Sequence, residues 1–169
     1  MQQLKTVDAN KNGSNMKKIL VLLLLCGCGF RPMFSGNDND IYVDKISGIN
    51  GIELRNSLNA KFGGARTPDA AYRLVVKLDE PQRTYKGLDT TGTATWQAIK
   101  LTAHYDLFAG DKKIASGAET ASESYTFVRY LVAATASYNN AVQNAVSVLA
   151  DKISSRAIAE TQNNEKLSK

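Results

Sequence analysis

Apolar and polar residues alternate along four stretches of the chain, which predicts four β-strands that each have one buried and one solvated face. The strands are expected at residues 41–46, 72–78, 93–109 and 113–125. The alternation is clearest in the third strand, where the residues expected on the buried face are Ile99, Leu101, Ala103, Tyr105 and Leu107. Residues 88–92 are rich in Asp, Thr and Gly, so we expect a turn or hairpin tip there.

Two other stretches repeat apolar residues every three or four positions, which is the period of an amphipathic helix. The first is expected at residues 50–62, where Asn50 and Glu53 have the spacing of a capping box and Gly63-Gly64 provides a stop. The second begins between residues 131 and 137 and ends near Glu160. Its expected core stripe is Tyr138, Val142, Ala145, Leu149, Ile153 and Ala157.

The order of these elements, β-α-β-β-β-α, provides two helices to cover one face of a four-stranded sheet. We therefore predict an α+β fold, a two-layer sandwich with a mostly antiparallel sheet and both helices on one side. The strands form a meander whose other face is solvated. The polar residues 161–169 are expected to be a fraying tail.

The stretch from Met16 to Phe30 differs from everything that follows. Lys17 and Lys18 precede seven consecutive aliphatic residues, 19–25, and small residues follow. A basic region, a short apolar region and a small-residue cleavage site are typical of a secretory signal peptide. The apolar run is shorter than the roughly 20 residues that a membrane-spanning helix needs.

The end of this signal resembles the lipobox of bacterial lipoproteins, in which a cysteine is lipidated and becomes the new N-terminus. Leu25 stands three residues before Cys28, and Gly27 directly precedes it. Cys26 is the competing candidate, but the bulky Leu25 would precede it directly, so we predict lipidation at Cys28. Residues 1–15 are interpreted as an upstream extension, which leaves Met1 and Met16 as alternative starts.

Removal of residues 1–27 changes the charge of the chain. That segment holds four of the 21 basic residues and one of the 16 acidic residues, which leaves 17 and 15 in the mature chain. The net positive charge is therefore largely part of the targeting signal, and we predict no nucleic-acid partner. The predicted organisation is a signal at 1–27, a lipidated cysteine and flexible linker at 28–40, one domain at 41–160 and a tail at 161–169.

The residue types that carry chemistry are sparse. The single histidine, His104, is expected on the solvated side of its strand, with no second histidine or cysteine nearby in the sequence. No metal-binding, phosphate-binding or nucleophile-elbow motif occurs. We therefore predict a protein that is not an enzyme and that has no metal and no cofactor other than the lipid on Cys28.

A binding surface remains. Arg83 and Lys86 flank the tip between the second and third strands together with Tyr85, and Arg129 lies between Phe127 and Tyr130. Guanidinium groups pair with phosphate, and aromatic rings lie against acyl chains. We therefore predict Arg83, Lys86 and Arg129 as contacts for a phosphorylated, acylated ligand. The alternative is that these side chains are ordinary solvated loop charges.

The run Cys28-Gly29-Phe30-Arg31-Pro32, the aromatic Phe34, the order of the elements and the Ala-rich last helix are similar to the LPS-assembly lipoprotein LptE family, in its alphaproteobacterial form. The resemblance covers residues 16–169. Cys26 stands where the family usually has Ala or Ser.

This resemblance implies a lipoprotein on the periplasmic face of the outer membrane, anchored by N-acyl and S-diacylglycerol groups on Cys28. It implies that the protein plugs the LptD β-barrel, assists the assembly of that barrel and contacts lipopolysaccharide (LPS). Two alternatives stay open. One is an adaptor lipoprotein of another envelope machine, such as a barrel-assembly or transport-auxiliary complex. The other is a small-ligand carrier or an enzyme.

Overall fold

The computed structural model describes residues 39–88, 90, 94–126 and 130–167, which all belong to one compact unit that begins at Gly36. The predicted signal, Cys28, the linker up to residue 38 and Arg129 lie outside the described residues. None of the described helices has an apolar stretch long enough to cross a membrane.

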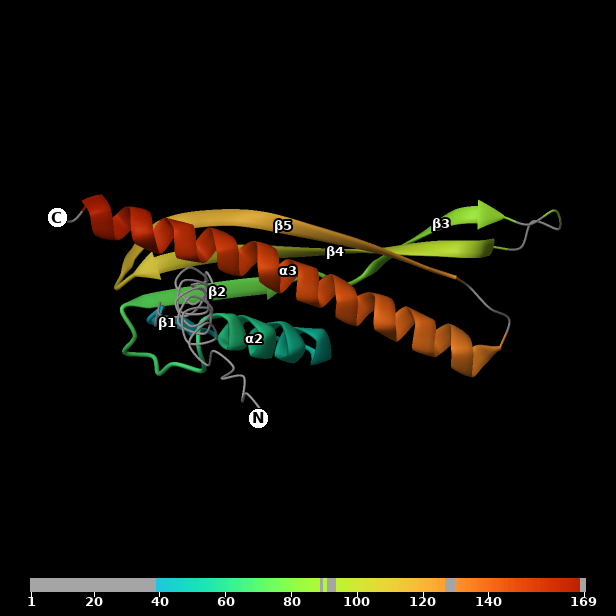
Figure 1. Cartoon of the computed structure of the whole chain (residues 1–169), viewed down its shortest axis with the longest axis horizontal. Helices are drawn as coiled ribbons and strands as arrows, with labels where there is room; N and C mark the ends of the chain where they lie inside the picture. The colour runs from blue at the N-terminus through green and yellow to red at the C-terminus, as the bar shows by residue number, and fades with distance from the viewer. Residues whose placement is uncertain (1–38, 89, 91–93, 127–129, 168–169) are drawn as a thin grey trace, which may run out of the picture. The chain divides into compact units, whose positions relative to one another are not determined.

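The described unit has two layers, a five-stranded sheet and two helices that cover one of its faces (Figure 1). This confirms the predicted α+β sandwich. The elements in chain order are β1 (Ile41–Val43), α2 (Ile49–Lys61), β2 (Tyr72–Leu78), β3 (Gln82–Leu88), β4 (Ala94–Ala109), β5 (Lys112–Thr126) and α3 (Leu131–Leu167). Only β1 and β2 pair in parallel, and the other pairs are antiparallel.

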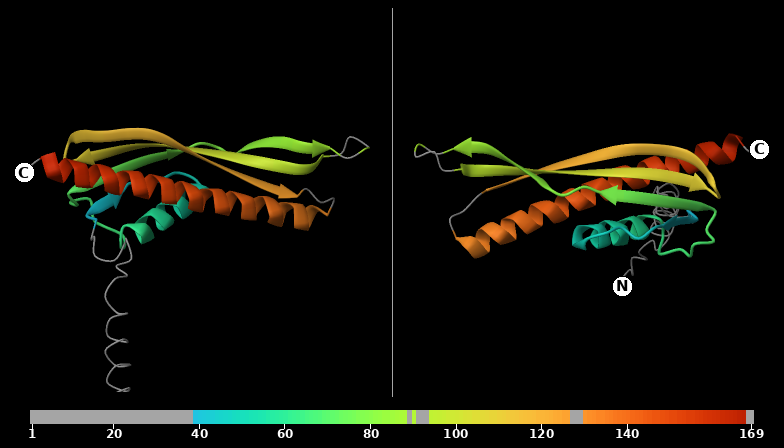
Figure 2. Two further views of the ribbon diagram at one scale, coloured as in Figure 1. Left: turned by 45° about the horizontal axis from the view of Figure 1, so that its top comes forward. Right: turned by 180° about the vertical axis from the view of Figure 1, so that it is seen from behind.

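Strand β4 is the centre of the sheet. On one side it pairs with β2 along 103–109 and with β3 along 94–100, and on the other side it pairs with β5 over nearly its whole length. The two ends of the domain therefore differ (Figure 2). We call the end where β4 turns into β5 through Gly110 the proximal end. We call the opposite end, which holds β3 and the start of α3, the distal end.

Strand β3 is a correction to the four strands predicted from the sequence. Its residues do not alternate clearly between apolar and polar, and Gly87 lies at a register shift in the pairing with β4. The strand forms because the long β4 offers a free edge beyond the end of β2. The other four strands follow the predicted order.

The core lies between the helices and the inner face of the sheet. The predicted inward residues of β4 are all buried, and so is the α3 stripe except for Tyr138, which is partly buried. Leu54, Leu58 and Phe62, which lie on one face of α2 and directly after it, have no exposed surface. These burial patterns confirm the predicted faces.

The start of α2 differs from the prediction. The N-cap residue is Gly48, with φ 84°, and no side chain caps the helix, so the capping box of Asn50 and Glu53 does not form. Packing decides the start, because a Cβ at Gly51 would lie 2.8 Å from Cγ2 of Ile46. The predicted stop is confirmed, since Gly63 and Gly64 both have positive φ.

The end of α3 also differs, because the helix continues to Leu167 and not only to about Glu160. Thr161 continues the buried stripe four residues after Ala157, and its hydroxyl donates to the Ile158 carbonyl at 2.9 Å. The polar residues 162–166 include Gln, Glu and Lys, which favour helices. Tertiary contact and local propensity therefore extend the helix past the predicted end.

The outer edge of β5 pairs with no described strand. Helix α3 reaches this edge with two cations. The Lys152 ammonium donates to the Thr120 carbonyl at 2.6 Å, and Arg156 Nε lies 3.5 Å from Glu119 Oε1. A further ion pair, Lys61 with Asp151, joins α2 to α3.

Candidate functional site

A groove of about 590 Å³ opens between the two layers at the distal end of the domain. Its wall in the sheet layer comes from β3, β4 and β5, and its other wall comes from the first turns of α3. The lining residues are Arg83, Tyr85, Gln97, Tyr125, Leu131, Ala134, Thr135, Tyr138 and Asn139. We call this the distal groove. Its volume lies in the range of ordinary ligand-binding pockets.

The distal groove exists because the first turns of α3 do not fill the space above the sheet. Residues 133–137 are Ala, Ala, Thr, Ala and Ser, and the first buried residue of α3 is Ala141. Helix α2 belongs to the other half of the domain (Figure 1). The side chains at the start of α3 are thus too small to fill the space between the two layers, and a groove remains there.

The floor of the groove is polar and ordered. The Tyr125 hydroxyl donates to Gln97 Oε1 at 2.7 Å, and both residues are buried. Burial raises the pKa of Tyr125, and the nearby positive charge of Arg83 partly opposes this rise. The Tyr125 ring meets the Tyr138 ring edge-on, with centroids 5.9 Å apart. This network fixes the two rings on either side of the groove.

Arg83 provides the positive charge of the groove. Its guanidinium lies over the Tyr138 ring, 4.0 Å from the centroid, which holds the side chain across the groove. No carboxylate among the described residues forms an ion pair with it. The contact with the ring leaves this charge without a described carboxylate partner, so Arg83 is positioned to bind an anionic group.

The predicted ligand residues have different outcomes. Arg83 lines the distal groove, whereas Lys86 is exposed on the same strand and does not line it. Arg129 and Cys28 lie outside the described residues, so their roles stay predictions. The sequence analysis missed Gln97, Tyr125 and Asn139. A prediction of a strand at residues 82–88 would have brought Arg83 and Tyr85 together, because residues two apart on a strand share a face.

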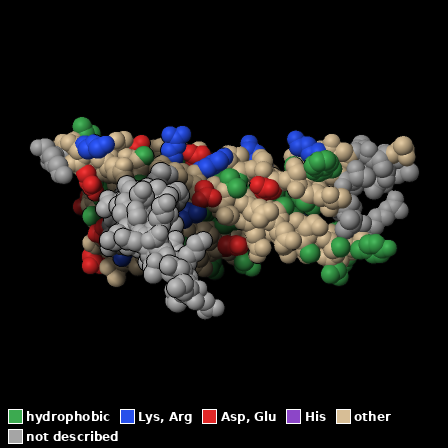
Figure 3. All heavy atoms as spheres, viewed as in Figure 1, with side chains coloured by type: hydrophobic (Ala, Val, Ile, Leu, Met, Phe, Trp, Pro, Cys, Tyr) green, Lys and Arg blue, Asp and Glu red, His purple; other side chains and the backbone are tan. Residues whose placement is uncertain are grey.

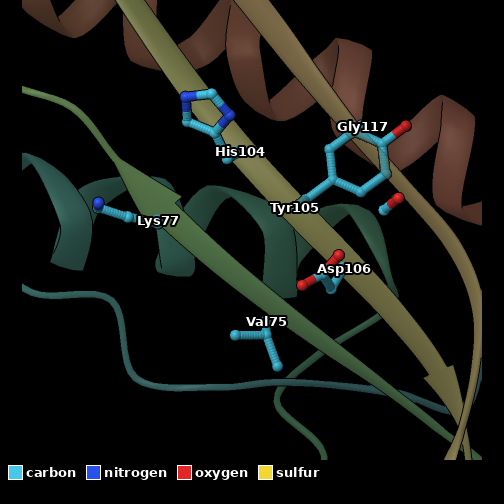
Figure 4. Close-up of a pocket in the computed structure, with 7 residues that line it drawn as sticks. Val75, Lys77, His104, Tyr105, Asp106 and Gly117 are labelled. Carbon is cyan, nitrogen blue, oxygen red and sulfur yellow. The ribbon is translucent and has the colours of Figure 1, made fainter.

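A second hollow, of about 430 Å³, lies on the sheet beside β2, β4 and β5 (Figure 4). The predicted exposed position of His104 is confirmed, and its Nε2 lies 3.3 Å from Asp79 Oδ2. Asp106 pairs with Lys113 at 3.1 Å. The charge of Asp106 is thus matched within the domain, and no group of His, Cys, Asp and Glu in the described part of the chain is arranged to hold a metal.

Tyr105 and Gly117 also border this second hollow and lie opposite each other on β4 and β5. A Cβ at Gly117 would lie 2.8 Å from the Tyr105 hydroxyl, so the absence of a side chain makes room for the ring. Burial, and secondarily the charge of Glu119, raises the pKa of Tyr105. The phenol therefore stays neutral and serves packing.

Solved structures of bacterial lipoproteins share this architecture. A predicted lipoprotein from Caulobacter crescentus aligns over 76% of this chain and 93% of its own, with a TM-score of 0.60 and 21% identity. Rare lipoprotein B from Shewanella oneidensis aligns over 75% and 98%, with a TM-score of 0.59 and 17% identity. The domain has the fold of these lipoproteins.

A minor lipoprotein from Acinetobacter baumannii has the same fold, with a TM-score of 0.54 and 15% identity over 73% of this chain and 93% of its own. No protein-family model and no curated protein matches the chain. The likeness to the lipoprotein fold is therefore one of three-dimensional arrangement. It covers nearly all of each of the three neighbours, so the comparison concerns whole domains.

Proposed function

We propose that this chain is the LptE-like lipoprotein subunit of an LPS translocon. Cys28 carries the acyl chains that anchor it to the periplasmic face of the outer membrane. The domain plugs the lumen of an LptD β-barrel, assists the assembly of that barrel and contacts LPS on its way to the cell surface. In this role the protein acts by shape and binding and is not an enzyme.

The observation that carries this proposal is the fold. The domain aligns with nearly the complete chain of rare lipoprotein B and with two further lipoproteins. The signal and the Cys28-Gly29-Phe30-Arg31-Pro32 run point to the same class from an independent part of the chain. Fold and targeting sequence thus support one assignment.

The face of the sheet that the helices leave uncovered suits a plug inside a wet barrel. It presents polar and charged side chains, including Lys77, Lys100, Thr102 and His104. The lumen of a large outer-membrane barrel is also lined by polar groups. Contact between two such surfaces places polar groups against polar groups.

The distal groove suits a phosphorylated and acylated ligand. Arg83 supplies a charge without a carboxylate partner among the described residues, and Tyr125, Tyr138 and Leu131 supply apolar walls. Arginine is the side chain that best matches the geometry of phosphate oxygens. LPS combines phosphate groups with acyl chains, so we assign Arg83 as its principal described contact.

Affinity purification of the lipidated protein from detergent-solubilised membranes, followed by mass spectrometry, tests the barrel partner. We expect a large outer-membrane β-barrel in about equal amount, and we expect LPS at the cell surface to fall when the protein is depleted. A lipidated protein that extracts alone, with LPS export intact on depletion, would contradict the proposal. Recovery of another envelope complex would favour the adaptor alternative.

Charge reversal in the distal groove should separate LPS binding from barrel binding. Arg83→Glu is expected to weaken LPS binding about 10- to 100-fold, because a charge-assisted hydrogen bond contributes about 1.5–3 kcal/mol and each 1.4 kcal/mol is tenfold. Lys86→Glu should have a smaller effect, since Lys86 does not line the groove. Arg129→Glu should act in the same direction. Binding of purified LPS by the mature protein is the measurement.

Lys100→Glu is the matched control for Arg83→Glu, because Lys100 is an exposed cation on the uncovered face of the sheet. It should leave LPS binding unchanged. Equal loss of LPS binding and barrel binding in Arg83→Glu would show that the groove is an interface with the barrel and not a ligand site.

A further inference from the structure

Large apolar side chains are exposed together at the distal end of the domain. In the view of Figure 3, hydrophobic side chains gather at that end along its upper and its lower margin. Of the eight large hydrophobic residues found exposed in the described part of the chain, four belong to β3, β4 or the start of α3, and a fifth directly precedes α3. They are Tyr85 (68% exposed), Trp96 (56%), Tyr130 (81%), Leu131 (81%) and Val132 (83%), and we call them the distal rim.

The distal rim combines residues from both layers. Tyr85 and Leu131 also line the distal groove, from opposite walls. Successive side chains of a strand point to opposite faces of the sheet. Because Gln97 is buried on the helix side, its neighbour Trp96 lies on the uncovered face of β4. No described element covers any of these side chains. Apolar groups left together in water at the end of a domain are typical of a contact surface.

The charge around the rim is positive. The two charged residues of β3, Arg83 and Lys86, are both basic. Arg83 and Lys86 form no ion pair within the described part of the chain. A local excess of cations beside apolar groups complements an anionic surface.

The residue types favour a lipid surface as that partner. Trp and Tyr prefer the boundary between water and lipid, because their rings are apolar and their N–H or O–H groups remain hydrated. Leu131 and Val132 can enter the acyl region, while Arg83 and Lys86 keep their charges among the headgroups. The same combination without the excess of cations would fit an apolar protein surface equally well.

We propose that the distal rim inserts into the interface of an anionic lipid leaflet. This goes beyond the translocon assignment, since it requires neither a barrel nor LPS. With an acyl anchor at Cys28, the rim is a second attachment point, and its weak contact is strengthened because the anchor already confines the domain to the membrane. In molecules that are not docked in a barrel, the rim thus holds the distal groove next to a leaflet, where an acylated ligand is found.

Trp96 is the single tryptophan of the chain, so its fluorescence reports on the rim alone. The experiment uses the mature chain, residues 28–169, with Cys28→Ala and shown to be folded by circular dichroism, so that neither the signal nor an acyl chain contributes to binding. It is mixed with vesicles of phosphatidylcholine that contain or lack phosphatidylglycerol. We expect a blue shift of Trp96 emission and co-sedimentation only with the anionic vesicles, both weakened by salt.

The double variant Leu131→Ser/Val132→Ser should bind these vesicles at least tenfold more weakly. Its matched control is Ile49→Ser/Ile52→Ser on α2, which removes two exposed apolar side chains far from the rim in the sequence and should bind normally. No blue shift with anionic vesicles, or equal loss in both double variants, would overturn the proposal. Binding to LPS or to a purified barrel without any binding to vesicles would also overturn it.

Discussion

Cys28→Ala should move the protein from the membrane fraction to the soluble periplasmic fraction and leave its domain folded. The acyl chains contribute roughly 0.8 kcal/mol for each buried methylene group, so two or three chains make anchoring effectively permanent, and their loss removes nearly all of it. The core formed by the described residues begins at Ile41, so we expect the anchor to add nothing to it. Cell fractionation and a thermal unfolding curve of the purified variant test both parts.

Cys26→Ala is the matched control, because it changes the neighbouring cysteine that competes for lipidation. It should remain in the membrane fraction, and mass spectrometry should find the acylated N-terminus at Cys28. Anchoring that survives in Cys28→Ala and disappears in Cys26→Ala would reverse the assignment. A Cys28→Ala protein that is unfolded after release from the membrane would contradict the independence of anchor and core.

Leu149→Ala should lower the free energy of unfolding by about 2–5 kcal/mol, because it removes a fully buried side chain and leaves a cavity that the core fills only in part. Leu149 has no exposed surface and lies in the stripe of α3 that packs into the core cluster. A domain of this size has roughly 5–15 kcal/mol of stability in total. Unfolding in urea, followed by circular dichroism, measures the change.

Val132→Ala is the control on the same helix. Val132 is apolar but almost fully exposed, so this substitution should change stability by less than about 0.5 kcal/mol. If both variants lost the same amount, burial would not be the cause, and helix propensity would not explain the loss either, because alanine is the best helix former. That outcome would also question the two-layer core.

The faces of the strands and helices could be predicted because burial imposes a period on the sequence. Two examples are the buried pairs Leu101 and Leu107 on β4 and Leu149 and Ile153 on α3, whose spacings match the periods of a strand and of a helix. The start of α2 could not be predicted in the same way, because it depends on how closely the helix packs on Ile46. A capping box at Asn50 is locally plausible, but tertiary contact decides against it.

Strand β3 shows the same limit for the sheet. Its formation depends on the length of β4, which reaches beyond the end of β2 and offers an edge for pairing. Nothing within residues 82–88 carries that information. The predicted turn at residues 88–92 falls partly outside the described residues.

The candidate site could be predicted only in part. The sequence pointed to Arg83 through its charge and its aromatic neighbours, and the structure places it in the distal groove. The groove itself exists because residues 133–137 have small side chains, which leave space opposite the polar Gln97. Small side chains carry no chemical signal in a sequence, so the groove could not be predicted from them. Tyr138, which lines the groove, fits the period of the core stripe equally well.

The edge of β5 has a consequence for how the chain is made. Outward-facing amides on an unpaired strand recruit strands from other molecules, and a nearby positive charge deters this. Here the deterrent is Lys152, which reaches the Thr120 carbonyl from α3. Because α3 follows β5 in the chain, a nascent molecule emerges with this edge bare until the last helix is synthesised and docked. Aggregation during overproduction should therefore begin in that interval, and chaperones that hold extended segments should suppress it.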